Sequence, residues 1–188
     1  MTCLTPTRPL QVLSAPLVVA DGNLPLPSLL ALMALCHTHR VPLFFEPTDL
    51  RKAALPLSSP TPSALTYCSP NLPELRAMLA TLPGEPEELG SLSLATAEQV
   101  LPRVAAATAR LLEHYGISVV MVTLSECGVL VVRRGPPSAP LPLRGALGPN
   151  SGEVSGVWYP GEPVDRQSVV SVSGAGDCLA AGTLHTEH

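Results

Sequence analysis

Apolar residues occur along this chain in two patterns, short continuous runs and longer stretches with helical spacing. The runs predict buried strands, because a strand that is covered on both faces needs no polar side. They lie at 17–20, 42–45, 65–68 and 117–122. The stretches 27–36 and 101–112 have the spacing of amphipathic helices. This alternation is typical of an α/β fold, with a mainly parallel sheet and helices on both faces.

Turn-forming residues set the limits of several elements. Asn71 and Glu74 are spaced as a helix N-cap and its N3 partner, which predicts a capping box at the start of another helix. Gly116 is expected to end the helix over 101–112, and Pro102 to lie in its first turn or to mark a kink.

A second apolar run at 129–132 follows Gly128 and predicts a hairpin or the edge of a βαβ unit. The length of 188 residues suggests one domain over 1–188. We expect an irregular lead at 1–15, a loop at 55–63, and a long Pro/Gly-rich connection at 133–168. This connection contains a short predicted strand at 157–159.

Composition narrows the class of protein. A formal net charge of −4 and the lack of a basic block argue against nucleic acid as a partner. The 5 cysteines are scattered and form no C-x-x-C pair, which favours reduced thiols in a soluble, cytoplasmic protein. No apolar stretch is long enough to suggest a membrane anchor.

The strongest chemical signal is the string Gly174-Ala175-Gly176-Asp177. The β-branched run at 169–172 predicts a strand before it, and small residues predict a helix after it. A glycine turn at a helix N-terminus attracts anions, and a carboxylate placed there can act as a base on an attacking hydroxyl. The alternative, an ordinary strand-to-helix turn with Asp177 as N-cap, is about equally common for such a string on its own.

Two further acids stand at predicted strand ends. Asp21 follows the run 17–20, and Glu46 follows 42–45. Open α/β sheets bind their ligands at the carboxyl ends of the strands. Loop acids and helix caps are the alternative explanation for both residues.

The string at 174–177 resembles the second signature of the ribokinase-like (PfkB) carbohydrate kinases. The resemblance implies that Asp177 is the catalytic base and that the backbone of Gly174, Ala175 and Gly176 forms an anion hole for the transferred phosphoryl group. Ser171 and Thr183 depart from the common form of the signature.

Two other segments resemble motifs of the same family, in the same order. Asn71-x-x-Glu74 is similar to its N-x-x-E motif, in which the Glu helps to place Mg²⁺ through water. Val122-Thr-Leu-x-x-x-Gly128 is similar to its ATP-phosphate loop, with Ser125 where Gly is usual. The resemblance therefore implies that Asn71, Thr123, Ser125 and Gly128 contact ATP phosphates.

The resemblance implies a phosphotransferase that uses ATP with Mg²⁺ on a sugar or nucleoside acceptor. It leaves open a monovalent cation and a homo-oligomer. Asp21-Gly-Asn23, Phe45-Glu-Pro-Thr48 and Lys52 look most like the pseudouridine kinase branch, which would make pseudouridine 5′-phosphate. The sequence identifies no acceptor-binding residue by itself.

The family's N-terminal half, with its sugar-binding motif and lid strands, has no counterpart here. The family also continues with further helices beyond the position of His188. We therefore expect a fragment or truncated isoform, with weak binding of Mg-ATP and little phosphorylation of pseudouridine or ribose. A catalytically silent, nucleotide-binding or partner-binding remnant of such a kinase is the alternative. A Rossmann site is excluded because Leu179 occupies its last glycine position, and the chain contains no Walker A string.

Overall fold

The computed structural model describes residues 12–84, 89, 97–138, 152–162, 171 and 174–185. Its strands form a single six-stranded sheet in the spatial order β1 to β6. The strands are β1 (Val18–Asp21), β2 (Leu43–Glu46), β3 (Leu65–Cys68), β4 (Val119–Thr123), β5 (Val129–Arg134) and β6 (Val154–Tyr159). The helices are α2 (Leu26–His39), α3 (Leu72–Leu79), α4 (Ala97–Tyr115) and α5 (Ala175–His185).

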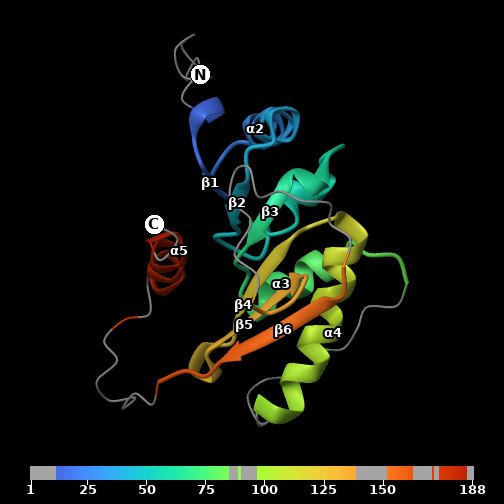
Figure 1. The fold of residues 1–188 in the computed structure, drawn as a ribbon, viewed down its shortest axis with the longest axis vertical. Coiled ribbons are helices and arrows are strands. Elements are labelled where there is room, and N and C mark those ends of the chain that lie inside the picture. Colours follow the sequence, from blue (N-terminus) through green and yellow to red (C-terminus); the bar gives the residue numbers. More distant parts are fainter. Residues whose placement is uncertain are drawn as a thin grey trace.

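Strands β1 to β4 are parallel and lie side by side in chain order, whereas β4, β5 and β6 pair antiparallel. Because crossovers between parallel strands are right-handed, strands added in one direction place their connections on one face. Helices α2, α3 and α4 accordingly pack against one face of the sheet, and α5 packs against the other. In Figure 1 the sheet stands between α4 and α5. The predicted fold class is confirmed.

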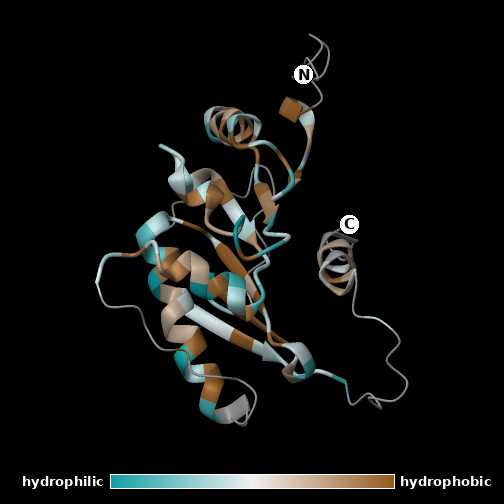
Figure 2. Ribbon diagram, turned by 180° about the vertical axis from the view of Figure 1, so that it is seen from behind, coloured by the Kyte–Doolittle hydropathy of each residue, from teal (hydrophilic) through white to brown (hydrophobic). Residues whose placement is uncertain are grey.

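The larger core lies between the sheet and α2, α3 and α4, and includes the fully buried Leu29, Phe45 and Leu111. Figure 2 shows hydrophobic positions along the central strands, and alternating hydrophobic and hydrophilic positions along α4. A smaller cluster on the other face joins Ala180 of α5 to a stacked pair, Phe44 and Tyr67, whose ring centroids lie 6.0 Å apart.

The predicted element at 65–68 has the observed bounds. For the runs 117–122 and 129–132 the structure selects the hairpin from the two alternatives, because β4 and β5 pair antiparallel. Pro102 lies inside α4 and not in its first turn, because the helix already begins at Ala97. The loop at 55–63 contains two short 3₁₀ turns, η1 (Leu55–Ser58) and η2 (Pro62–Ala64).

The connection predicted over 133–168 contains the end of β5 and a longer strand, β6, than the one predicted at 157–159. Of the strand predicted at 169–172 the structure describes residue 171 alone, and most of the lead at 1–15 lies outside the described residues. In the part of the chain that the structure describes, no helix has the length and apolar character needed to cross a membrane.

Candidate functional site

Strands β1 to β4 all end at one edge of the sheet, and four of the segments singled out in the sequence lie there. Asn71 forms a parallel bridge with Thr123, the last residue of β4. The backbone N–H of Thr123 donates to the carbonyl of Pro70 over 3.0 Å. The start of the predicted phosphate loop is therefore joined directly to the predicted Asn-x-x-Glu motif.

The capping box predicted at the start of α3 is confirmed. Asn71 Oδ1 accepts from the Glu74 backbone N–H at 2.9 Å, and Glu74 Oε2 accepts from the Asn71 backbone N–H at 2.8 Å. The Glu74 side chain is only 4% exposed. Burial raises the pKa of Glu74, and the charge of Asp49 adds to this rise, while the hydrogen bonds with Asn71 oppose it. Both residues thus have a structural role, and their roles toward phosphate and Mg²⁺ stay predictions.

The predicted phosphate loop is a tight turn between β4 and β5 that contains η3 (Ser125–Cys127). Ser125 has φ 54°, so a serine occupies the left-handed region where the family has glycine. Gly128 has φ 88°, and a Cβ there would lie 2.1 Å from the carbonyl oxygen of Tyr159. The indole N–H of Trp158 donates to the Cys127 carbonyl at 2.7 Å. The turn is therefore held against the end of β6, which fixes its conformation.

The turn before α5 has the geometry expected of a glycine turn. Gly174 has φ 81°, and its carbonyl accepts from the Cys178 N–H at 2.9 Å. The helix begins at Ala175, so Asp177 is the third helical residue and not the N-cap of the alternative explanation. The side chain of Asp177 lies outside what the structure describes, and its role as base stays a prediction.

Gly176 connects this turn to the edge of the sheet. The nearest atom to a Cβ built on Gly176 is Glu46 Oε1, at 3.6 Å. The other carboxylate oxygen of Glu46 accepts a short hydrogen bond from the hydroxyl of Ser69, which is 4% exposed. The Ser69 N–H also donates to the Phe45 carbonyl at 3.3 Å. A contiguous series of contacts therefore runs from the glycine turn through Glu46 and Ser69 toward Asn71.

The sequence marked Glu46 as an acid at a strand end and as part of the segment Phe45–Thr48, and it did not mark Ser69. The available signal was the position of Ser69, directly after a buried strand and two residues before Asn71. The residue before Ser69 is Cys68, which is fully buried at the end of β3. Burial raises its pKa well above 9.0, and the charges of Glu46 and Glu74 add to the rise. The thiol therefore stays protonated and acts as a packing group.

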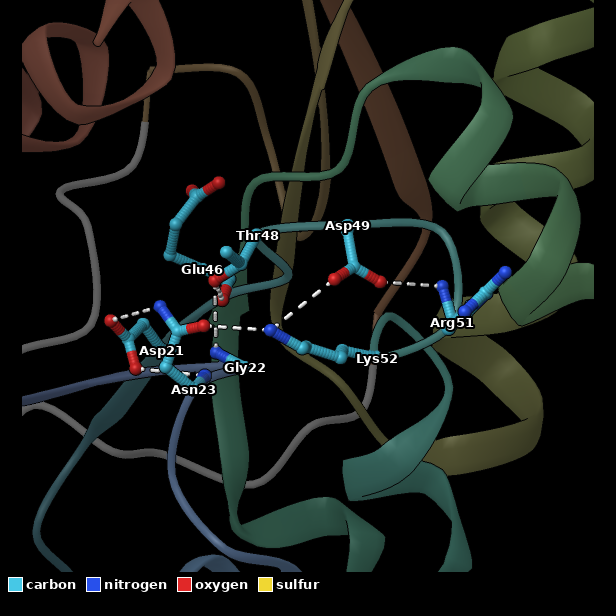
Figure 3. Close-up of polar contacts among 8 residues, drawn as sticks. All are labelled: Asp21, Gly22, Asn23, Glu46, Thr48, Asp49, Arg51 and Lys52. Atoms are coloured by element: carbon cyan, nitrogen blue, oxygen red, sulfur yellow. Dashed lines mark hydrogen bonds and ion pairs between the residues drawn. The ribbon is translucent and has the colours of Figure 1, made fainter.

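A second polar network lies beside Glu46 and joins the loops after β1 and β2 (Figure 3). Lys52 Nζ donates to Asn23 Oδ1 at 2.7 Å and pairs with Asp49 at 3.2 Å. Asp21 accepts hydrogen bonds from the backbone N–H and the side-chain amide of Asn23, at 3.0 and 3.2 Å. In Figure 3 the Glu46 carboxylate extends away from this network.

The two loops approach each other closely at Gly22. Its N–H lies within hydrogen-bonding distance of the Glu46 carbonyl, at 2.9 Å, and of Thr48 Oγ1, at 3.2 Å. A Cβ on Gly22 would lie 2.3 Å from the Pro47 carbonyl oxygen. Thr48 has φ 71°, which is costly for a β-branched residue. The segments that suggested the pseudouridine kinase branch are therefore held together as one rigid corner.

The oxygen atoms at this edge are not arranged as a preformed metal cage. Among the described residues, no group of three or more His, Cys, Asp or Glu side chains is placed to hold a metal ion. A site that takes its metal together with a ligand needs fewer protein donors, because the ligand supplies the others.

No family model matches this chain, and no curated protein matches it in sequence. Solved structures do match. The ribokinase from Cryptococcus neoformans var. grubii serotype A, in complex with ADP, has a TM-score of 0.61 at 19% identity, over 93% of this chain and 51% of its own. The adenosine kinase from Sinorhizobium meliloti has a TM-score of 0.59 at 19% identity, over 94% and 43%.

The Arabidopsis thaliana ribokinase, complexed with ribose and ATP, has a TM-score of 0.58 at 15% identity, over 94% of this chain and 44% of its own. This chain thus spans about half the length of the kinases that it matches. Identities this low establish a shared fold and not a shared activity. The described chain therefore has the α/β fold of ribokinase-like carbohydrate kinases.

Proposed function

We propose that this chain carries the phosphoryl-transfer region of a sugar or nucleoside kinase that uses ATP. The observation that carries this proposal is the series of contacts that brings Gly176, Glu46, Asn71 and Thr123 to one edge of the sheet. These residues come from four separate segments, three of which had been assigned to phosphate or metal from sequence. Open α/β sheets bind their ligands at the carboxyl ends of parallel strands, where these residues lie.

The chemistry assigned to these residues is an in-line displacement. The acceptor hydroxyl attacks the γ-phosphorus of ATP, its proton passes to the Asp177 carboxylate, and the bond from the γ-phosphorus to the bridging oxygen of ADP breaks. Backbone N–H groups at Gly174, Ala175 and Gly176 stabilise the negative charge on the transferred group. Thr123, Ser125 and Gly128 hold the other phosphates.

The residues at this edge fit a magnesium ion. Mg²⁺ prefers oxygen donors and keeps several of its waters, so one or two carboxylates and the phosphates of a nucleotide suffice. Glu46 and Glu74 supply carboxylate oxygens here, and Glu74 would act through water because it is buried in its capping box. When bound, Mg²⁺ neutralises charge on the phosphates.

For the acceptor we propose a nucleoside, and pseudouridine in particular. The support is the rigid corner formed by Gly22, Asn23, Thr48 and Lys52, since these segments resemble the pseudouridine kinase branch and lie at the same edge as the phosphate residues. The hydrogen bonds among these residues hold their side chains in place beside Glu46, where they can position a sugar.

The test is a coupled ADP-release assay with purified protein, in which pseudouridine, ribose and adenosine are compared, together with calorimetric binding of Mg-ATP. We expect weak Mg-ATP binding and slow release of ADP, since the matched kinases are about twice as long. Release that depends on the acceptor should fall at least about 100-fold in Asp177→Asn, the usual scale for loss of a general base, while ATP binding persists.

Equal release by the two proteins would remove Asp177 from the mechanism. Binding of Mg-ATP without any release would favour the alternative, a silent nucleotide-binding protein.

A further inference from the structure

We propose that Trp158 is a positioning residue for nucleotide binding, whose indole N–H couples the end of β6 to phosphate binding at the turn between β4 and β5. The inference rests on the proposed function, because it concerns how the same turn is prepared for a phosphate. In this role Trp158 acts through the Cys127 carbonyl, which accepts its hydrogen bond at 2.7 Å.

The carbonyl groups of the turn give the first reason. A turn that binds an anion has to keep its carbonyl oxygens away from that anion, because they carry partial negative charge. Three carbonyls accept from backbone N–H groups of the turn itself, at 3.0, 3.1 and 2.8 Å; they belong to Leu124, Ser125 and Gly128. The Cys127 carbonyl accepts from Trp158 instead. The fourth of these bonds therefore comes from outside the turn, from another strand.

The backbone around this bond gives the second reason. A Cβ on Gly128 would lie 2.4 Å from the Gly161 nitrogen, and a Cβ on Gly161 would lie 2.4 Å from the Glu126 carbonyl oxygen. The turn and the segment that follows β6 therefore meet backbone to backbone. The Trp158 bond adds a directional contact to this packing, so a change at the end of β6 is transmitted to the turn.

Simple support of the hairpin is the alternative role for this bond. Strands β4 and β5 already pair over five residue pairs, and Trp158 is no part of that ladder. Its indole N–H reaches the turn itself, at the residue directly before Gly128. The Trp158 side chain is also 39% exposed, so it buries less apolar surface than a core aromatic residue does. Its directional bond to the turn is thus the contact that needs an explanation.

Coupling between two events is reciprocal: if the Trp158 bond strengthens phosphate binding, bound phosphate strengthens the Trp158 bond by the same factor. Trp158→Phe keeps an aromatic ring and removes the N–H. We expect its affinity for Mg-ATP to fall about three- to tenfold, the scale of one hydrogen bond. Magnesium tripolyphosphate should lose affinity by the same factor, because the effect concerns phosphate and not adenine. In wild-type protein, saturating Mg-ATP should slow exchange of the indole N–H with water about three- to tenfold.

Calorimetry measures both affinities, and nuclear magnetic resonance of protein with isotopically labelled tryptophan measures the exchange. The chain has a single tryptophan, so the one indole signal belongs to Trp158. Tyr159→Phe is the matched control, because Tyr159 is the next aromatic residue of β6 and its side chain is exposed. This variant leaves the bond to Cys127 in place and should keep the wild-type affinities. Thermal melting of every variant measures stability separately.

If Trp158 only supports the hairpin, Trp158→Phe will melt at a lower temperature but bind both probes with wild-type affinity, and Mg-ATP will leave indole exchange unchanged. That result, or an equal loss of affinity in Tyr159→Phe, would overturn the inference and leave the proposed function standing. If Trp158→Phe does not fold, indole exchange in wild-type protein decides alone. Wild-type protein that binds neither Mg-ATP nor magnesium tripolyphosphate would overturn both proposals.

Discussion

Lys52 Nζ lies 2.7 Å from Asn23 Oδ1, and this hydrogen bond joins the loop after β1 to the loop after β2. The same ammonium group pairs with Asp49, and the Lys52 side chain is 33% exposed. Replacement by Met keeps most of the apolar stem and removes both contacts. We expect Lys52→Met to lower the free energy of unfolding by about 1 kcal/mol or less, because partly exposed pairs are screened.

Urea unfolding measures the change, and Arg51→Met is its control. Arg51 carries the same charge on the same loop and is exposed, so its replacement should change stability by less than about 0.5 kcal/mol. An equal loss in both variants would show that the charge of the loop matters and the Asn23 bond does not.

The serine at position 125 is predicted to cost stability. Its φ of 54° is disfavoured for a residue with a Cβ, and its side chain is exposed. Ser125→Gly should therefore raise the free energy of unfolding by about 0.5–1 kcal/mol. This value is the backbone strain that the substitution relieves, minus the larger conformational entropy that glycine loses on folding. Thermal unfolding tests this, with Ser125→Val as the opposite case, since a β-branched residue should lower the melting temperature. If Gly and Val at this position have the same effect, the strain is absent.

Glu74 should make stability depend on pH. Because burial raises its pKa above the ordinary value of 4.5, the folded protein binds this proton more tightly than the unfolded chain does. The contribution of Glu74 to stability is thus full below pH 4.5 and is lost as the pH rises through the folded pKa. In Glu74→Gln this part of the pH dependence should disappear, while Gln retains the capping box.

Urea titrations of both proteins from pH 4 upward, at intervals of about half a unit, measure this difference. Asn71→Ala is the contrasting variant, which should lose about 1 kcal/mol at every pH because it removes the cap. Parallel curves for wild type and Glu74→Gln would contradict the prediction.

Substitutions of two glycines in α5, Gly176 and Gly182, can distinguish an effect on stability from an effect on nucleotide binding. A Cβ at Gly176 would be in ordinary contact with Glu46, and a Cβ at Gly182 would meet nothing within 4 Å. Because alanine favours helices, both Gly→Ala variants should keep the wild-type stability or exceed it by up to about 1 kcal/mol. Only Gly176→Ala places a methyl group where a phosphate would approach the turn, so it alone should weaken Mg-ATP binding, by at least about tenfold.

Calorimetry and thermal melting of the same two preparations decide the outcome. Equal ATP affinity in the two variants would mean that phosphate does not approach Gly176.

Local patterns in the sequence were sufficient for much of the fold. The strand predicted at 65–68 is β3 with the same bounds, and the capping box predicted from the spacing of Asn71 and Glu74 is present. Both predictions succeeded because each feature depends on residues only a few positions apart. For Pro102 the sequence left two alternatives, the first turn of a helix or a kink. The first is wrong, because α4 begins at Ala97 and contains the proline in its interior.

The contacts of the site were harder to foresee. The approach of Glu46 to Gly176, and the bond between Glu46 and Ser69, join residues from different elements, and no periodicity records such pairs. The strain at Ser125 was visible only as a departure from a family motif, since a single residue's φ depends on how its turn closes.

The order of the strands also has a consequence for how the molecule assembles. Strands β1 to β4 pair with their neighbours in chain order, so the sheet can grow from its first strand as the chain emerges from the ribosome. The turn before α5 meets Glu46 only after the six described strands have been made, and this contact closes a long loop. The contact between the turn before α5 and Glu46 is thus expected to form late during synthesis and to open early in local unfolding.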